Sequence, residues 1–334
     1  MKKNLLKTLS GLLFTILLFS GCKKETEQLP VVNDVPDEQV ARPHDDDNKC
    51  QLRRVDFGNS QFYEFHYNNK GLADKWHIDY GGGDFIDYQM MYNNRNKIIK
   101  THLTQPFLGN VNYKFYYTGN FITHITGHDE LSGELVADIY FSYNRKGQMV
   151  KQDDIVGDTH SRYFYNNSGF NTRTYFYIGS DLIAESHHKY DIPNRNPYLA
   201  VKGVELGFPF PGFESFNKRL LSQDSVIIYD EGEPFLINDY DPAKTRIQTG
   251  IHNYVTHAYY FDRASFIHRN RNILFTYQHC GDNDDDFDKT IVPSASKEVG
   301  PLSPVDRLNK ILSQPSKNIK QELKAFRKQY LEHR

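Results

Sequence analysis

The polar and apolar positions of residues 50–280 alternate in short runs that stop at turn-forming residues. In the first clear run Tyr63, Phe65 and Tyr67 alternate with polar residues, so the three side chains share one face of a strand. Residues 68–71, which follow, read Asn-Asn-Lys-Gly. Asn favours the start of a turn, and Gly supplies the left-handed residue that closes a hairpin. The pattern therefore predicts a hairpin followed by a return strand.

This pattern recurs every 22 to 26 residues along the chain. The equivalent tyrosines, each followed by a short polar turn, are Tyr67, Tyr92, Tyr117, Tyr143 and Tyr165. Asn96 replaces the closing Gly in the second copy, and Asn tolerates that left-handed conformation well. The copies become irregular after Tyr190, where Pro193 and Pro197 oppose regular strand pairing. A constant period of this size indicates a repeat architecture.

The recurring Tyr-Asn/Asp-x-x-Gly motif resembles the YD repeats of RHS-type proteins. It is more similar to a family of Gram-negative lipoproteins that carry such repeats in a domain of unknown function. The resemblance covers about residues 60–280. It implies a mainly β fold, a curved or spiralling antiparallel meander of repeated hairpins that forms a single extended sheet or an open, barrel-like one. It implies no particular chemistry.

The N-terminal residues have the pattern of an export signal. Lysines precede an apolar stretch, residues 9–19, that is too short to cross a bilayer as a helix. Residues 18–22 read Leu-Phe-Ser-Gly-Cys and resemble the lipobox of bacterial lipoproteins. The resemblance implies that residues 1–21 are a signal peptide, cleaved after Gly21, and that Cys22 is acylated. The alternatives are an ordinary transmembrane anchor and a simple secretory signal.

Residues 22–49 are rich in charge and proline and show no apolar periodicity, which predicts a disordered tether. The charged residues directly after Cys22 resemble the tag that sends some Gram-negative lipoproteins to the outer face of the outer membrane. A solvated linker explains them equally well. We therefore expect a location in the cell envelope, with a lipid anchor in the outer membrane, on its periplasmic face or at the cell surface.

Two further cysteines flank the repeats. Cys50 precedes the first strand-like run, and Cys280 ends the last one. In an exported protein such a pair favours a disulfide, although two free buried thiols are the alternative. A bridge that closes so long a loop would contribute about 5 kcal/mol in the chain-entropy model.

The C-terminal part has a different pattern. Residues 281–302 read as an acidic, Pro-containing linker, and residues 303–334 as a helical tail that begins at Ser303 as the cap. One apolar stripe follows the second half of the tail, at Ile319, Leu323, Phe326 and Tyr330. The tail is basic, so it would bind an anionic surface or a partner, or else pack on the β domain with its charged face in solvent.

One acidic segment has the spacing of a possible calcium site. Its alternate carboxylates are Asp282, Asp284, Asp286 and Asp288. Carboxylates suit Ca²⁺, but Phe287 and Pro293 stand where an EF-hand loop has its Gly and its bidentate Glu. A solvated acidic loop is the alternative, and no cofactor is indicated.

Several function classes have no support in the sequence. The chain contains no His-Glu-x-x-His, Cys-x-x-Cys, Gly-x-Ser-x-Gly or P-loop motif. Its formal net charge is −2, which gives no general attraction to nucleic acid. We therefore expect a protein that is not an enzyme and does not bind nucleic acid.

A set of basic residues recurs at one position of the repeat, four residues after the turn-closing residue. The set consists of Lys75, Lys100, Lys151 and Arg173, with His124 nearby in the short third copy. Trp76 is the next residue in the first copy, at a position that is otherwise polar, so we expect it to be exposed. A cationic column beside an aromatic ring would suit an acidic glycan. The alternative is ordinary charged chemistry on an outward strand face.

Three functions follow as hypotheses. The first is a non-catalytic lipoprotein that binds a glycan or a protein partner. The second is a structural or assembly lipoprotein that acts as a scaffold in an envelope complex. A hydrolytic enzyme is the least supported, because no spacing singles out a pair of carboxylates.

Overall fold

The computed structural model describes most of the predicted β body and little outside it. The described residues are 50–58, 60–106, 109–190, 194, 196–201, 219–230, 233–250, 254–261, 271–279, 322, 325, 326 and 328. All of them belong to the second of two compact units, His44–Arg334, and none to the first, Met1–Pro43. The predicted signal peptide, tether and acidic linker lie outside the described residues.

The described residues form seventeen strands in one antiparallel sheet and one short 3-10 helix. The first nine strands are β1 (Gln51–Gly58), β2 (Gln61–Tyr67), β3 (Ala73–Asp79), β4 (Phe85–Tyr92), β5 (Ile98–Gln105), β6 (Gly109–Thr118), β7 (Phe121–Asp129), β8 (Leu135–Tyr143) and β9 (Met149–Asp154). They are followed by β10 (Thr159–Tyr165), β11 (Asn171–Ile178), β12 (Asp181–Lys189), η2 (Pro197–Ala200), β13 (Gln223–Asp230), β14 (Glu233–Asp239), β15 (Arg246–Thr249), β16 (Val255–Tyr260) and β17 (Arg271–Gln278).

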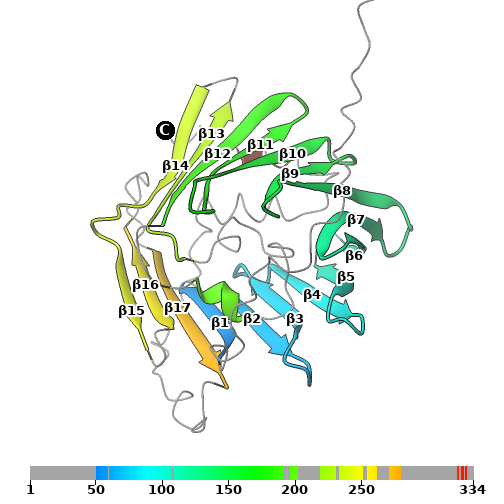
Figure 1. Ribbon diagram of the computed structural model, residues 1–334, viewed down its shortest axis with the longest axis horizontal. Coiled ribbons are helices and arrows are strands. Elements are labelled where there is room, and N and C mark those ends of the chain that lie inside the picture. The colour runs from blue at the N-terminus through cyan, green and yellow to red at the C-terminus, as the bar shows by residue number, and fades with distance from the viewer. Residues whose placement is uncertain are drawn as a thin grey trace, which may run out of the picture. The chain divides into compact units, whose positions relative to one another are not determined.

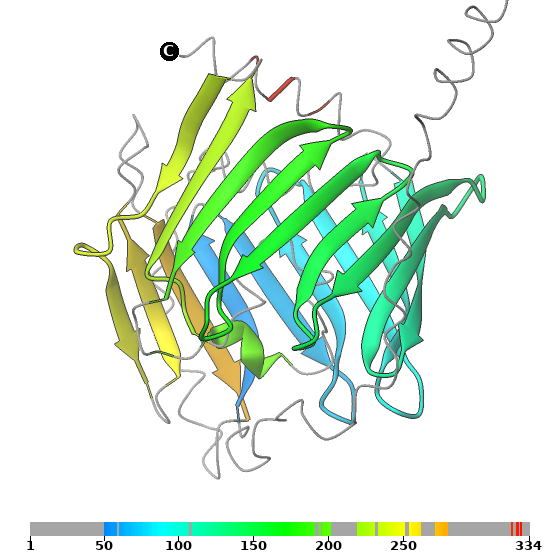
Figure 2. The same cartoon turned by 45° about the horizontal axis from the view of Figure 1, so that its top comes forward.

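The sheet is a meander with one long-range closure. Each strand from β1 to β14 pairs with the next, and β15 to β17 pair in the same way. The last strand, β17, pairs with β1, so Gln51 lies opposite Gln278. The pairing therefore runs from β15 through β17 and β1 to β14, and these two strands are the ends of an open, curved sheet (Figures 1 and 2). The predicted mainly β meander of hairpins is confirmed.

The recurring tyrosine ties each repeat to the one before it. The hydroxyl of Tyr92 donates a hydrogen bond of 2.5 Å to the carbonyl of Ala73, at the start of the preceding return strand. We call these recurring residues the anchor tyrosines. The others make the equivalent bond to a backbone carbonyl: Tyr67 to Leu52, Tyr117 to Ile98, Tyr143 to Ile122 and Tyr165 to Met149, and Tyr277 on β17 does the same to Val255. The tyrosine is thus a structural residue that fixes the spacing of the repeats.

The turn after each tyrosine has the predicted chemistry. The side-chain oxygen of Asn68 accepts hydrogen bonds from the backbone amides of Lys70 and Leu72, and Gly71 closes the turn at φ 71°. Asn96 takes the same conformation, with φ 60°, in the second copy. These short polar residues satisfy the turn amides locally, which is why they are placed here.

A β-bulge accompanies every anchor tyrosine. Tyr67 pairs with Ala73, whereas His66 pairs with Lys75, so Asp74 is an extra residue in the return strand. Equivalent register shifts occur at Tyr92, Tyr117, Tyr143 and Tyr165. A bulge lets two consecutive residues face outward and reverses the alternation that follows. It therefore decides which residues of each return strand reach the core.

The core lies against the inner face of the curved sheet. At its centre the Trp76 ring stacks on Phe65 and Tyr88, with ring centroids 5.7 and 5.2 Å apart, and meets the edge of Tyr63. The core continues through β16 and β17 and includes Ala200, the last residue of the short helix η2. Close packing on this face also requires Gly127, since a Cβ there would lie 2.7 Å from the Tyr113 ring.

Hydrogen bonds and a ring stack also connect the two ends of the open sheet, near β13–β14 and β15–β16. The Tyr260 hydroxyl donates to the carbonyl of Leu221 at 3.2 Å, and the Thr245 hydroxyl donates to that of Ser222 at 3.4 Å. The rings of Tyr240 and Tyr260 stack at 4.8 Å. These contacts hold the segment before β13 close to the β15–β16 hairpin.

Little of the C-terminal tail is described. Glu322, Ala325, Phe326 and Lys328 are helical, and Phe326 is 2% exposed. Burial of Phe326, which belongs to the predicted apolar stripe, agrees with a tail that packs its apolar face. The bounds of the tail stay a prediction.

Candidate binding surface

The predicted basic residues lie on the outer face of the sheet. Lys75, Lys100 and Arg173 are exposed, and Lys151 is half-buried. The bulge after each turn aims them outward, because each directly follows the extra residue of its return strand. Whether they bind a ligand stays a prediction.

These residues follow a slanted line and not a single row. The row through Lys75 passes Gln89 and reaches β5 at His102, two residues beyond Lys100. Likewise, the row through Lys151 passes Arg162 and reaches β11 at Tyr175, two residues beyond Arg173. From one repeat to the next the basic position moves across two strands, which are about 4.8 Å apart, and along the strand by two residues, at about 3.3 Å each. Equivalent basic positions of successive repeats therefore lie about 12 Å apart.

The expectation that Trp76 is exposed is wrong. Its side chain is 0% exposed and lies between the Phe65 and Tyr88 rings. The bulge at Asp74 lets Asp74 and Lys75 both face outward, so Trp76 turns inward. The equivalent residues Thr101 and Thr174 are also buried, each 1% exposed. Trp76 is therefore part of the core.

An aromatic platform does exist, but on later strands. We call it the basic–aromatic patch; its members on β9, β10 and β11 are Lys151, Arg162, Phe164, Arg173, Tyr175 and Tyr177. Cross-strand pairing brings them together: Arg162 lies between Lys151 and Tyr175, and Phe164 lies opposite Arg173. Strand backbones fix these positions, so the surface is organised without a ligand.

Contacts within the basic–aromatic patch orient its side chains. The Arg173 guanidinium Nη1 donates to the Tyr175 hydroxyl at 2.9 Å, and its carbon lies 5.8 Å from the centre of that ring. Arg162 lies 6.0 Å from the centre of the Tyr177 ring. The Phe164 ring meets Tyr175 edge to face at 5.2 Å, and 44% of Phe164 is exposed. These contacts leave cations and apolar ring surface open to solvent side by side.

The charges of the patch are only partly balanced. Lys151 pairs with Asp153 at 2.8 Å, and nearby Glu185 contacts His187 at 3.1 Å. In the described part of the chain no ion pair involves Arg162 or Arg173. Two guanidinium groups, each suited to bidentate contact with a carboxylate, thus remain for a ligand.

His160 borders the patch and pairs with Asp153 across β9 and β10. Burial lowers its pKa, and Arg162 and Lys151 act in the same direction against the opposite influence of Asp153. The imidazole stacks on Tyr177 with ring centroids 4.5 Å apart. It adds ring surface to this part of the sheet.

A second aromatic group on the outer face is less open. His124 is stacked between Tyr116 and Tyr140, with ring centroids 5.0 and 4.3 Å apart, and its Nε2 lies 2.6 Å from an Asp138 carboxylate oxygen. The rings cover one another's faces across β6, β7 and β8. Such a cross-strand stack stabilises the sheet. His124, which the sequence places near the basic residues, thus contacts Tyr116, Tyr140 and Asp138.

Other predicted sites are only partly described. Cys50 is disulfide-bonded and buried. Cys280 lies outside the described residues. Gln51, the residue after Cys50, pairs with Gln278, two positions before Cys280 in the sequence. The pairing of Cys50 with Cys280 stays a prediction that this register favours.

The lipid and metal predictions fall on residues that are not described. These are Cys22 and the four aspartates Asp282, Asp284, Asp286 and Asp288. Within the described ranges no group of three or more His, Cys, Asp or Glu side chains has the arrangement of a metal site. No helix within the same ranges has the length and apolar character needed to span a membrane.

The repeat pattern in the sequence identified Lys151 and Arg173 but not the residues beside them. Arg162 lies on β10 and Tyr175 and Tyr177 lie on β11, and only the strand register shows that β10 and β11 bring them next to Lys151. The alternation of Arg162 and Phe164 with buried Ser161 and Tyr163 was the available signal.

Comparisons with known proteins give structural likeness only. No family model and no curated protein matches the sequence. A porin-like protein from Bacteroides uniformis ATCC 8492 aligns at 12% identity over 69% of this chain and 95% of its own, with a TM-score of 0.39. A porin-like protein from Bacteroides vulgatus ATCC 8482 aligns at 11% identity over 67% and 97%, with a TM-score of 0.33.

The solved structures that match also include a TcdB2-TccC3-TEV chain. It aligns at 9% identity over 65% of this chain and 14% of its own length, with a TM-score of 0.20. At these values the likenesses say nothing about activity or ligand.

Proposed function

We propose that this protein is a lipid-anchored protein of the bacterial cell envelope whose β domain binds an acidic glycan without catalysis. Cys22 would carry the anchor, and the basic–aromatic patch would carry the ligand. The observation that supports the binding role most directly is the cross-strand assembly of three cations and three ring side chains on one exposed surface.

The chemistry of the patch matches that of an acidic sugar. Arg162 and Arg173 would make charge-assisted hydrogen bonds to carboxylates, which are shorter and stronger than neutral ones. Phe164 and Tyr175 would pack against the apolar C–H face of a sugar ring. Because Arg173 is already held by the Tyr175 hydroxyl, less side-chain freedom would be lost on binding.

A glycan-binding experiment tests the patch. The full chain is held in neutral detergent micelles and titrated with a short oligogalacturonate and with a neutral oligosaccharide of equal length. We expect binding of the acidic sugar only, and a loss of about 10-fold or more in Arg162→Gln and Arg173→Gln, in keeping with one lost charged hydrogen bond.

The matched control is Arg246→Gln, which removes the same charge from an exposed position on β15. It should bind as the unmodified chain does. If no acidic glycan binds, or if all three variants bind equally well, the proposed role of the patch is wrong and a scaffold role becomes the better hypothesis.

The lipid anchor has its own test. Cells that express the full chain are grown with a labelled fatty acid, and the protein is isolated. We expect label in the unmodified chain and none in Cys22→Ser. Label in Cys22→Ser would place the acylation elsewhere, and absence of label in both would reject the anchor.

A further inference from the structure

The hairpin turns of the sheet differ in charge according to the rim on which they lie. In an antiparallel meander alternate turns lie at opposite ends of the strands. The turns that follow β2, β4, β6, β8 and β10 form one rim, and those that follow β3, β5, β7, β9 and β11 form the other.

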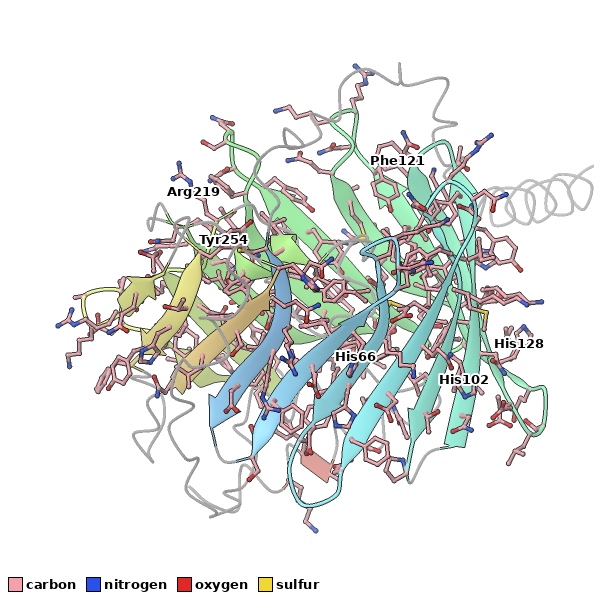
Figure 3. The ribbon with its side chains drawn as sticks, turned by 90° about the horizontal axis from the view of Figure 1, so that it is seen from below. His66, His102, Phe121, His128, Arg219 and Tyr254 are labelled. Atoms are coloured by element: carbon pink, nitrogen blue, oxygen red, sulfur yellow. The ribbon has the colours of Figure 1, made fainter. Side chains whose placement is uncertain are left out.

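The first of these rims is basic, and we call it the basic rim. Its turns span residues 67–73, 92–98, 117–121, 143–149 and 165–171 and contain no Asp or Glu. They carry Lys70, Arg95, Lys97, Arg145 and Lys146. The third and fifth turns have no charge of their own. At the fifth turn Arg219, which is labelled in Figure 3, lies 5.5 Å from the centre of the Phe170 ring.

The opposite rim is acidic. The turns over residues 79–85, 129–135, 154–159 and 178–181 contain no Lys or Arg. They carry Asp79, Asp84, Asp129, Glu130, Glu134, Asp154, Asp158 and Asp181. The small net charge of the whole chain is therefore compatible with two rims whose turns carry opposite charges.

The cations of the basic rim are available to a ligand. Lys70, Arg95, Arg145 and Lys146 are exposed, and none of them makes an ion pair with another described residue. Lys97 differs, since its Nζ donates to the carbonyl of Gly119 at 2.6 Å and links neighbouring turns. Four of the five turn cations thus face solvent.

The basic rim is continuous with the slanted line of cations on the outer face. Lys75 and Lys100 lie a few residues from their turns, and Lys100 faces a further lysine, Lys114, on β6. The same line ends at Lys151 and Arg173, inside the basic–aromatic patch. Rim, line and patch together form one basic stripe that crosses β3 to β11.

We infer that this stripe binds a long, linear acidic polysaccharide that lies across the strands, with its charges meeting the cations of successive repeats. This inference rests on the proposed function and extends it from a short sugar at one patch to a polymer along five repeats. Equivalent positions of the stripe lie about 12 Å apart from one repeat to the next, and His124 takes the place of Lys or Arg in the third repeat. A linear polymer with regularly placed carboxylates has the matching form, and the acidic rim would repel it from the other end of the strands.

The inference predicts that affinity depends on chain length. Each further repeat that the polymer reaches adds a contact within the same molecule, which raises the affinity without any new kind of interaction. Binding should also weaken strongly with salt, because each neutralised charge releases counterions from the polymer.

The experiment uses the full chain in neutral detergent micelles and oligogalacturonates of short, intermediate and long length. We expect the affinity per chain to rise by about 100-fold from the short to the long polymer. The variant Lys70→Gln, Arg95→Gln, Lys146→Gln should lose most of this gain and keep the binding of the short sugar. The control Arg246→Gln should keep both.

The outcomes separate the two proposals. Binding of the short sugar with no gain for the long polymer, or an unchanged gain in the triple variant, overturns the stripe and leaves the patch in place. No binding at any length rejects the patch as well. Vesicles of anionic phospholipid serve as a competitor: if they displace the polymer while neutral vesicles do not, and the triple variant abolishes this effect, the stripe serves a lipid surface and the inference is overturned.

Discussion

The early and late repeats of the sheet share one backbone design but differ in the side chains that their two faces carry. In β2 to β5 the inner face carries Phe65, Trp76 and Tyr88, and the outer face carries lysine, glutamine and histidine, with Phe62 and Phe85 beside His77. In β9 to β12 aromatic rings of the basic–aromatic patch lie outside. The inner face there includes buried polar residues, namely Asp154, Ser161, Asn171, Thr174, Ser186 and His188.

The turns and anchor tyrosines are nevertheless the same in both regions. Tyr92 and Tyr165 make equivalent hydrogen bonds, of 2.5 and 2.7 Å, to the preceding return strand. The same backbone frame thus carries different side chains in the two regions. The early repeats can supply a core while the late repeats supply a surface that is open to a ligand.

The largest expected effect lies in the early core. Trp76→Ala should lower the free energy of unfolding by about 3–5 kcal/mol, because it removes a buried ring and leaves a cavity. Tyr175→Ala, at an outward position of the late repeats, should cost about 1 kcal/mol or less. Urea unfolding followed by circular dichroism measures both, and equal losses would refute the division into core and surface.

A smaller effect tests the shared frame. Tyr92→Phe and Tyr165→Phe each remove one hydroxyl and leave a carbonyl without that partner, so each should cost about 1–2 kcal/mol. The control Tyr116→Phe alters an exposed ring with no hydrogen bond to a preceding repeat and should change little. If Tyr92→Phe lost stability and Tyr165→Phe did not, the tyrosine bond would matter only in the early repeats, and the two regions would differ in their backbone arrangement as well as in their side chains.

The polar inner face of the late repeats predicts a dependence on pH. Burial raises the pKa of Asp154 above the ordinary value of 3.8, although backbone amides of Asp138, Gly157 and Val156 donate to it. Between the two pKa values the folded chain holds a proton that the unfolded chain has lost, so stability falls as pH rises through this range.

The variant Asp154→Asn keeps an oxygen for the backbone amides and cannot ionise. Its stability relative to the unmodified chain should therefore be greater at pH 7 than below pH 3.8. Thermal unfolding across this pH range measures the difference. A constant difference at all pH values would show that the carboxyl is not penalised by its surroundings.

The smallest effect on stability is expected on the outer face. Arg162→Gln should change the free energy of unfolding by about 0.5 kcal/mol or less, since its side chain is exposed and makes no ion pair with the described residues. Its effect on glycan binding should be much larger. A variant that lost both together would mark Arg162 as a structural residue.

The frame was predictable from sequence because its determinants are local. Tyr67, Asn68 and Gly71 lie within five residues of one another, and the same set recurs along the chain. The bulge was not predictable, since a single extra residue such as Asp74 leaves no mark in the alternation of a short strand. This omission alone explains why Trp76 was assigned to the wrong face.

The candidate binding surface could be predicted only in part, for a related reason. Lys151 and Arg173 share a repeat position, so counting along the chain finds them. Arg162 and Tyr177 join them through pairing between strands, with a stagger that the sequence does not state. Residues that become neighbours through strand pairing can be identified as a group only once the register of the sheet is known.

The tyrosine bonds described above make each repeat a cassette that connects to its predecessor in the same way. Because the bond is made to a backbone carbonyl, it does not depend on the side chains of the preceding unit. Arrays of this kind gain or lose whole units while neighbouring interfaces persist. Duplication of one unit would therefore lengthen the sheet by one hairpin and add one further copy of each outward-facing repeat position.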